Sequence, residues 1–363
     1  MKIIHVADLH LDSKMTANLD NIKAKERRSE LLITFNNMIT YAVKNKVNAI
    51  IIAGDLFDTK NVSMAAKNAV KGAIENNPDI DFYYLKGNHD AESFLAGLET
   101  VPGNLKMFGE SWISYELDDD IVITGVELDK KNSKSIYNSL VLNMDKFNIV
   151  TLHGQESEHQ KKDKAETINI SELRNKGIDY LALGHIHAYK EATLDARGIY
   201  CYPGCLEGRG FDECGEHGFV VLDIENKKCM TTFVPFAGRN LYTVSVDIAG
   251  CMSTVDIAER IREVLDREDY SPSSLLKLVL VGEVDVECEK DIDFLRKRFE
   301  SGYYFLKIYD ESGLKVDYNQ FALDESLKGE FVRTVMSSAD LTDEEKATIV
   351  RYGIQALAGE ELN

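Results

Sequence analysis

The stretch Ala49-Ile-Ile-Ile-Ala-Gly-Asp-Leu-Phe-Asp58 decides the fold class. Its first five residues are all apolar, which is typical of a strand buried on both faces, and Gly54 and Asp55 end that strand. Apolar runs that end in Asp, His, Asn or Gly recur along the chain: Ile3–Ala7, Phe82–Leu85, Asn148–Leu152 and Tyr180–Leu183. Helix-like segments over Leu31–Val43 and Val62–Glu75 alternate with these strands, so the pattern predicts an α/β fold with helices covering the sheets.

The chain divides near Pro235–Arg239 into parts of different character. Residues 1–237 hold the strand-end motifs, and residues 238–312 follow a β-α-β-α-β pattern in which Leu275–Val284 is one strand. Residues 313–363 are expected to form a helical tail with helices over about Ser326–Met336 and Asp343–Leu357. Thr342 and Glu345 form a capping-box signature at the start of the second helix.

The 363 residues include 42 Lys+Arg and 61 Asp+Glu, a formal net charge of -19. This balance excludes a strongly basic protein that coats nucleic acid. Residues 1–237 carry a net charge of -8 and the remaining 126 carry -11, so the acidity lies disproportionately in the second part. A nucleic-acid substrate is therefore not excluded, but we expect the isolated chain to bind DNA weakly and with strong salt dependence.

The sequence predicts a cytoplasmic protein that does not enter a membrane. Asp8 interrupts the N-terminus where a signal peptide would need a long apolar run. No apolar run approaches the roughly 18–20 residues of a membrane-spanning helix. The six cysteines are irregularly spaced, which does not indicate a disulfide framework.

Histidine, carboxylate and amide side chains gather at the predicted strand ends. Strand alternation would place Asp8 and His10 on one side of the chain, and His185 and His187 have the same spacing. Such a mixed N/O set suits Mn, Fe or Zn, and with Asp55 and His153 added it exceeds what one tetrahedral ion needs. We therefore predict two ions, because a pair about 3.5–4 Å apart can clamp the attacking and leaving oxygens of a phosphoryl displacement.

These motifs resemble the calcineurin-like metallophosphoesterase superfamily, whose signature runs D-x-H, G-D-x-x-D, G-N-H-[DE], H and G-H-x-H. Within it, HVADLHLDS, GDLFD, LKGNHD, DYLALGHIH and YPGCLEGRGFDECGEHGFVVLDI are similar to the SbcD-type DNA repair exonucleases. The resemblance covers about residues 1–237. It implies a two-sheet α/β sandwich core followed by a smaller capping domain.

The resemblance also implies a role for each motif residue. One metal ion would be held by Asp8, His10, Asp55 and His187, and a second by Asp55, Asn88, His153 and His185. His89 would face the phosphate and serve the transition state or the leaving group. Asp58 would lie in the same cavity and orient a histidine; the alternative is that it caps the following helix.

The implied activity is metal-dependent hydrolysis of DNA phosphodiesters by a two-metal-activated hydroxide. We expect Mn²⁺, with Fe or Zn as alternatives, and a coiled-coil ATPase of the SbcC kind as partner; a homodimer is left open. One rival is a phosphatase or phosphodiesterase of the same fold that acts on nucleotides, phosphoproteins or small esters. Another is a subunit that chiefly docks DNA or the ATPase and has weak catalysis.

Several further features have two interpretations each. Arg209, in a glycine-dense loop, either binds the substrate phosphate or is a solvated residue of a structural turn. The basic stretch Lys23–Arg28 and the loop His159–Lys164 either meet a DNA backbone or are solvated surface. The last helix either docks the ATPase or packs on its own domain. The spacing of Cys201, Cys205, Cys214 and His217 is not that of common zinc modules, so we expect buried, reduced thiols there.

Overall fold

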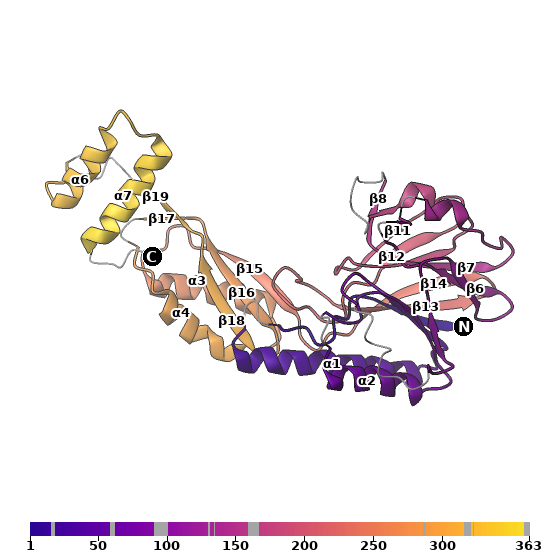
Figure 1. Ribbon diagram of the computed structural model, residues 1–363. Helices are drawn as coiled ribbons and strands as arrows, with labels where there is room; N and C mark the ends of the chain where they lie inside the picture. The colour runs from indigo at the N-terminus through magenta and orange to yellow at the C-terminus, as the bar shows by residue number, and fades with distance from the viewer. Residues whose placement is uncertain are drawn as a thin grey trace. The chain divides into compact units, whose positions relative to one another are not determined.

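Figure 1 shows the computed structural model, which describes residues 1–15, 19–58, 62–90, 101–129, 131–133, 135–158, 167–285, 288–315, 321 and 323–358. The chain forms two compact units, Met1–Asn240 (unit 1) and Leu241–Asn363 (unit 2). The α/β class predicted from the sequence is confirmed. No helix among the described residues is long and apolar enough to cross a membrane.

The first sheet of unit 1 has six strands in the order β14-β13-β1-β2-β3-β4. Neighbours from β1 to β4 run parallel, whereas β13 is antiparallel to both β1 and β14. The strands are β1 (Lys2–Val6), β2 (Ala49–Ala53), β3 (Asp81–Leu85), β4 (Leu105–Met107), β13 (Gly218–Glu225) and β14 (Lys228–Pro235).

The second sheet of unit 1 also has six strands, in the order β11-β12-β10-β7-β6-β5. Its four central strands are parallel, and each edge strand is antiparallel to its neighbour. The strands are β5 (Ile113–Glu116), β6 (Ile121–Gly125), β7 (Phe147–His153), β10 (Tyr180–Gly184), β11 (Lys190–Thr193) and β12 (Ile199–Tyr202). A short parallel pair, β8 (Gln155–Ser157) and β9 (Thr167–Asn169), lies apart from both sheets.

The two sheets face each other across a shared apolar core, so the predicted two-sheet sandwich is confirmed. Strand β2 explains the layering: Ala49, Ile51 and Ala53 pack toward the second sheet, while Ile50 and Ile52 pack into the core under the helices. Both faces of β2 are buried, as its unbroken apolar run predicted.

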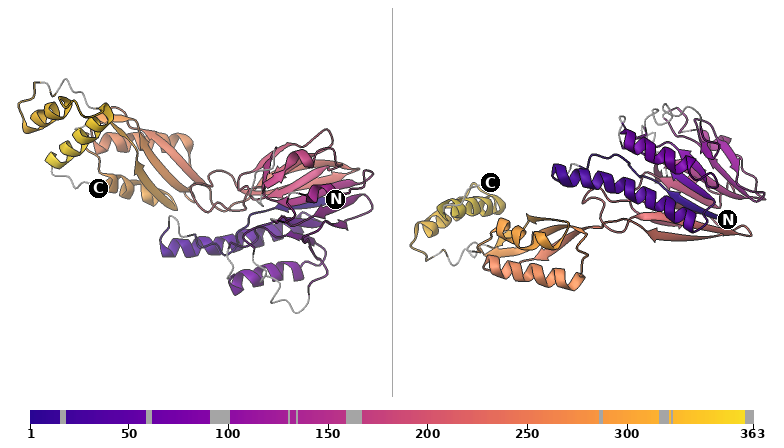
Figure 2. Two further views of the ribbon diagram at one scale, coloured as in Figure 1. Left: turned by 45° about the horizontal axis from the view of Figure 1, so that its top comes forward. Right: turned by 90° about the horizontal axis from the view of Figure 1, so that it is seen from below.

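Two long helices cover the outer face of the first sheet: α1 (Asn21–Lys44) and α2 (Met64–Glu75). Figure 2 shows them side by side. Ser63 caps α2, which excludes Asp58 as its cap. The outer face of the second sheet packs instead against apolar residues of loops and of the short 3-10 helices η2 (Ile136–Ser139) and η3 (Ile170–Glu172). In the described part of unit 1, α-helices therefore cover the first sheet, whereas loops and short 3-10 helices cover the second.

Unit 2 begins with a parallel sheet of three strands, β15 (Leu241–Asp247), β16 (Leu275–Val281) and β18 (Phe305–Asp310). The helices α3 (Thr254–Glu268) and α4 (Ile292–Phe299) share one apolar core with it, and the 3-10 helix η4 (Glu300–Gly302) follows α4. The strand predicted over Leu275–Val284 is interrupted at Gly282, whose φ of 96° is incompatible with a regular strand. The residues after it form β17 (Glu283–Asp285), which pairs with β19 (Gly313–Lys315).

The chain ends in two helices, α6 (Leu327–Met336) and α7 (Asp343–Ala358). They share a small apolar core of their own, which includes Val332 and Ile354. The capping box predicted at Thr342 and Glu345 is confirmed, because each residue's backbone N–H donates to the side chain of the other, at 2.8 and 3.3 Å. The second helix therefore begins where the sequence predicted.

Candidate metal centre

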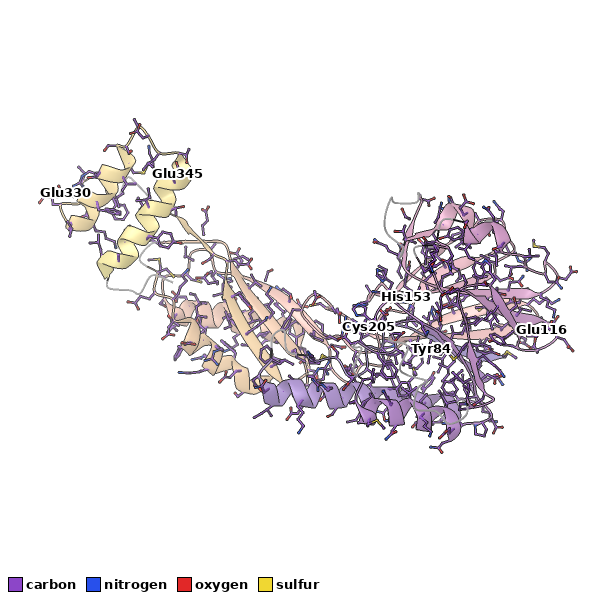
Figure 3. All side chains as sticks on the ribbon, viewed as in Figure 1. Tyr84, Glu116, His153, Cys205, Glu330 and Glu345 are labelled. Carbon is purple, nitrogen blue, oxygen red and sulfur yellow. The ribbon has the colours of Figure 1, made fainter. Side chains whose placement is uncertain are left out.

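The side chains of the predicted centre come from strand ends of both sheets. Asp8, His10, Asp55, Asn88 and His89 follow strands β1, β2 and β3, whereas His153 ends β7 and His185 and His187 follow β10. Strand β2 packs against both β7 and β10, so these ends meet at one edge of the sandwich. Figure 3 labels His153 at this edge. The structure thus brings together residues that are up to 179 positions apart in the sequence.

Left-handed backbone, rather than strand alternation, directs several of these side chains. Strand β1 ends before Asp8, and Asp8 and His10 have φ values of 51° and 44°; Asp55 has 50°. The Asp8 N–H donates to the carbonyl of Gly54, and the His10 N–H to that of Asp55, both at 3.0 Å. Side chains adopt this backbone only where the surroundings enforce it. Asp8 and His10 do reach one site, but our reason for expecting so was wrong.

Two glycines allow the two sheets to approach closely at this edge. A Cβ atom on Gly54, whose φ is 93°, would lie 2.1 Å from Nδ1 of His153. A Cβ atom on Gly184 would lie 1.9 Å from the carbonyl oxygen of Ala53. Any larger residue at either position would push the strand ends of the two sheets apart.

Asp8, His10 and His187 form a first group whose candidate ligand atoms lie within 4.8 Å of one another. Nδ1 of His187 lies 2.6 Å from Oε1 of Glu213, and Nδ1 of His10 lies 3.2 Å from Oδ1 of Asp58. Since a carboxylate accepts hydrogen bonds only, it favours the proton on the Nδ1 atom that faces it.

The Nε2 atoms of His10 and His187 are then left with lone pairs, and they lie only 3.2 Å apart. Two lone pairs at this distance repel unless a proton or a cation lies between them. Nitrogen donors beside the carboxylate of Asp8 fit a divalent transition metal. The residues present therefore fit one of the two predicted ions.

Asp8, Asp55 and His153 form a second group of the same kind. Nδ1 of His153 donates a hydrogen bond to the carbonyl of Ala53 at 2.9 Å. Its other ring nitrogen, Nε2, is therefore the one that could bind a metal ion. That Nε2 lies 3.4 Å from Oδ2 of Asp55 and 3.0 Å from Oδ1 of Asn88. The same Asp55 oxygen lies 3.8 Å from Nε2 of His10. The Asp55 carboxylate thus lies between the two groups.

His185 is placed differently from the other predicted ligands. Its backbone N–H donates to both carboxylate oxygens of Asp8, at 3.0 and 2.9 Å, and its φ is 103°. Its ring lies edge-on to that of His153, with 5.3 Å between the ring centroids. The ligand groups found among the described residues do not include its ring nitrogens.

His89 lies at the exposed side of the centre. Its side chain is 47% exposed, and its Nδ1 lies 3.7 Å from Oδ1 of Asp58. Its backbone N–H donates to Oδ1 of Asp55 at 2.9 Å. Asp58 therefore lies against the rings of both His10 and His89 and does not cap α2.

The protonation of the centre follows from its burial and its charge pairs. Burial raises the pKa of Asp8 to about 6. Burial by itself would lower the pKa of His153, but contact with Asp55 outweighs it and raises that pKa to about 9. The same contact holds the pKa of Asp55 below its usual range. The metal-free centre thus keeps a proton between Asp55 and His153, and a cation bound there would replace it.

Two carboxylates at the centre escaped the sequence analysis. Glu213 contacts His187, and Asp90 accepts hydrogen bonds from the N–H groups of Leu56, Phe57 and Gly87, at 2.9 to 3.2 Å. Asp90 is the last residue of the Gly87–Asp90 motif, in which the sequence predicted roles only for Asn88 and His89. For Glu213 the only signal was its place in the glycine-dense loop that holds Arg209.

The other sequence expectations have mixed outcomes. Arg27 is buried and ion-paired, so the Lys23–Arg28 stretch is not a uniformly solvated basic surface. The loop His159–Lys164 lies wholly outside the described residues. None of the six cysteines, all of which lie in the described part of the chain, forms a disulfide; Cys201 and Cys205 are buried, but Cys214 is exposed. Among the described residues, the cysteines join no group that would hold a metal ion.

Comparison with known proteins finds similarity to metallophosphoesterases and to DNA repair nucleases. The pattern described as calcineurin-like phosphoesterase matches residues 1–189. The uncharacterized metallophosphoesterase YhaO of Bacillus subtilis is 27% identical over 253 residues, 62% of this chain and 58% of its own length. The DNA double-strand break repair protein Mre11 of Aeropyrum pernix is 25% identical over 346 residues, 85% of this chain and 80% of its own. The SbcD component of the nuclease SbcCD from Staphylococcus epidermidis is 25% identical over 270 residues, which are 65% of this chain and 69% of its own length.

Proposed function

Because the chain belongs to the calcineurin-like phosphoesterase family, we propose that it is a two-metal phosphodiesterase that cleaves DNA as the nuclease subunit of a repair complex. The observation that carries this proposal is the pair of donor groups that share Asp8 and meet at Asp55. They offer two adjoining cation sites at the open edge of the sandwich. In-line hydrolysis of a phosphodiester uses such a pair.

We assign the ligands as the family resemblance implies; His185 is assigned on that resemblance alone. One ion would be held by Asp8, His10, Asp55 and His187, and the other by Asp55, Asn88, His153 and His185. Mn²⁺ suits this set, since all its donors are imidazole nitrogens and carboxylate or amide oxygens. When bound, the two ions lower the pKa of a water molecule and offset negative charge on the phosphoryl oxygens.

His89 is the residue that we place at the reacting phosphate. Its side chain is half exposed, so a substrate can reach it, and Asp58 lies 3.7 Å from its Nδ1. A carboxylate in this position helps to hold the imidazole ring in one orientation. The ring can then donate a hydrogen bond to a non-bridging oxygen and a proton to the leaving oxygen.

DNA is the substrate that the relatives favour. Mre11 of Aeropyrum pernix is described as a DNA double-strand break repair protein, and SbcCD of Staphylococcus epidermidis as a nuclease. The chain's acidity argues that a partner supplies much of the DNA affinity. Apolar side chains of α6 and α7 stay exposed, among them Leu327 at 69% and Leu357 at 46%, and they would suit docking on an ATPase subunit.

The test compares two substrates in the presence of Mn²⁺. The purified chain is assayed on single- and double-stranded DNA and on bis-p-nitrophenyl phosphate, alone and with a coiled-coil ATPase partner. We expect cleavage of both kinds of substrate and a loss of at least 100-fold in kcat for His89→Ala. Lys106→Ala is a matched control, since Lys106 lies on β4 away from the strand ends that form the centre.

Each outcome bears on a different part of the proposal. Hydrolysis of the small ester without DNA cleavage, with or without the ATPase, would leave a phosphodiesterase or phosphatase of the same fold. DNA binding with no hydrolysis of either substrate would instead indicate a docking subunit. Metal analysis that finds only one ion per chain at saturation would overturn the two-metal assignment.

A further inference from the structure

The loop between β12 and β13 carries an ion pair that lies against the candidate metal centre. Glu213 is 7% exposed and Arg209 is 20% exposed, and Nη2 of Arg209 donates to Oε1 of Glu213 at 2.8 Å. The Arg209 backbone N–H also donates to Oε2 of Glu213, at 2.7 Å. The carboxylate is therefore held by its own loop at both oxygens.

This carboxylate is aimed at one candidate ligand. Oε1 of Glu213 accepts from Nδ1 of His187 at 2.6 Å. Nη2 of Arg209 lies 3.2 Å from the same Nδ1, but the shorter contact to Glu213 decides where the proton lies. Glu213 thereby keeps the Nε2 lone pair of His187 directed at the centre.

The second NH2 group of Arg209 contacts another carboxylate, Asp58, which in turn lies against a candidate ligand, His10. Nη1 of Arg209 donates to Oδ1 of Asp58 at 3.1 Å, and that oxygen lies 3.2 Å from Nδ1 of His10. One guanidinium thus joins the two carboxylates that face Nδ1 of His10 and of His187. Two carboxylates near one another repel, and the planar fork of an arginine offsets that repulsion while fixing their geometry.

The loop itself is anchored on both sides of this pair. Its Cys205 N–H donates to the carbonyl of His187 at 3.0 Å. Sγ of Cys205 lies 3.2 Å from Nδ1 of His217, whose Nε2 lies 2.8 Å from the carbonyl oxygen of Glu213. Cys205, His217 and Glu213 are therefore linked to the segment that carries His187.

We propose that Arg209 and Glu213 are positioning residues that fix the orientation and tautomer of His187 and, through Asp58, of His10. This inference rests on the proposed role of the two histidines as metal ligands. It replaces the direct phosphate contact that the sequence suggested for Arg209, because the guanidinium is already bound to Asp58 and Glu213. Substitution of a group that orients a ligating histidine in this way typically lowers the metal affinity 10- to 100-fold.

The test measures the metal site and the histidine directly. Glu213→Gln keeps the side-chain shape but turns an NH2 group toward the cluster, and Arg209→Lys keeps the charge but removes the fork. Glu216→Gln, an exposed residue of the same loop, is the matched control. Mn²⁺ affinity is measured by calorimetry, and the tautomer of His187 in the metal-free protein by ¹⁵N NMR of the imidazoles.

We expect Mn²⁺ affinity to fall at least tenfold in Glu213→Gln and Arg209→Lys and to stay within twofold in Glu216→Gln. The Nδ1–H tautomer of His187 should dominate in the wild type and be lost in Glu213→Gln. KM for bis-p-nitrophenyl phosphate at saturating Mn²⁺ should not change in Arg209→Lys. An unchanged Mn²⁺ affinity with a raised KM in Arg209→Lys would overturn the inference and indicate that Arg209 contacts the substrate.

The two proposals fail in different ways. If the wild type binds no Mn²⁺, the proposed function fails, yet the NMR measurement still reports whether Glu213 sets the tautomer. If the wild type binds two ions and cleaves DNA while both variants match it in affinity and tautomer, only the positioning inference fails. Should Glu213→Gln not fold, Arg209→Lys provides the same comparison.

Discussion

Nη2 of Arg27 donates to Oε2 of Glu207 at 3.1 Å, and the two side chains are only 2% and 0% exposed. Glu207 also accepts from the hydroxyl of Thr34 at 2.7 Å and from the backbone N–H of Gly238 at 2.6 Å. The pair therefore joins helix α1 to the loop after β12 and to the segment that leaves unit 1. A residue that the sequence placed in a basic surface stretch is part of a buried network.

Removing Arg27 should strongly destabilise unit 1. Arg27→Met leaves the carboxylate of Glu207 buried without its cation, which typically costs about 3–5 kcal/mol. The measurement is the free energy of unfolding in urea. Lys25→Met on the exposed side of the same helix should change it by less than about 0.5 kcal/mol. Equal effects of the two substitutions would show that the Arg27 pair contributes nothing specific.

Adding a single methyl group at Gly54 should damage the metal centre. In Gly54→Ala the new Cβ meets Nδ1 of His153 at 2.1 Å on a backbone with φ of 93°, so His153 or the strand end must move. We expect a loss of about 1–3 kcal/mol in stability and a loss of metal binding, measured by urea unfolding and by metal analysis. Gly103→Ala, where a Cβ meets nothing within 4 Å, should leave both unchanged. Normal metal content in Gly54→Ala would contradict the described geometry.

Divalent metal should stabilise the folded chain through Asp8. A ligand that binds only the native state at 100 times its Kd adds about 2.7 kcal/mol, and EDTA should reverse the effect. Asp8→Asn should lose most of this stabilisation, because Asp8 is an assigned ligand of one ion and its carboxylate also lies within 4.8 Å of the candidate ligand atoms of Asp55 and His153. Asp119→Asn, at an exposed position, should retain it. Thermal unfolding with and without Mn²⁺ measures the difference, and equal shifts in both variants would point to nonspecific cation binding.

The stability of unit 2 should depend on pH through Asp310. Burial by itself would raise the pKa of this carboxyl, but hydrogen bonds from Lys290, at 2.6 Å, and Ser312 outweigh it and lower the pKa below its ordinary value. The folded state then binds the proton less readily than the unfolded state does. The resulting stabilisation is complete above the unfolded pKa of about 4 and is lost as the pH falls through the lower folded pKa.

Lys290→Met therefore tests this pair at two pH values. It should lower the free energy of unfolding by about 1 kcal/mol at pH 7, and the difference from the wild type should shrink toward pH 3. Arg267→Met, whose ion pair is exposed, should show no such change with pH. A loss in Lys290→Met that is equally large at both pH values would mean that packing, not charge, is responsible.

The sequence predicted most elements wherever one segment carries its own signal. The apolar run of β2 is buried on both faces, and the capping box at Thr342 begins α7 as expected. The sequence failed where backbone strain replaces a regular pattern. Gly282 interrupts a strand that its apolar neighbours seemed to continue, and Asp8 and His10 converge through left-handed backbone instead of alternation.

The sequence by itself determined the α/β class and the donor atoms of the centre, because strand periodicity and the chemistry of Asp, Asn and His are local properties. Only the tertiary structure decided which donors meet and which groups orient them. The glycine-dense loop drew attention to Arg209 but did not indicate its partners, Glu213 has no pattern of its own, and Arg27 has the same sequence context as its solvated neighbours. Their roles depend on packing two sheets and a loop against one another. Contacts across such distances in the chain arise from the shared core, which no single segment contains.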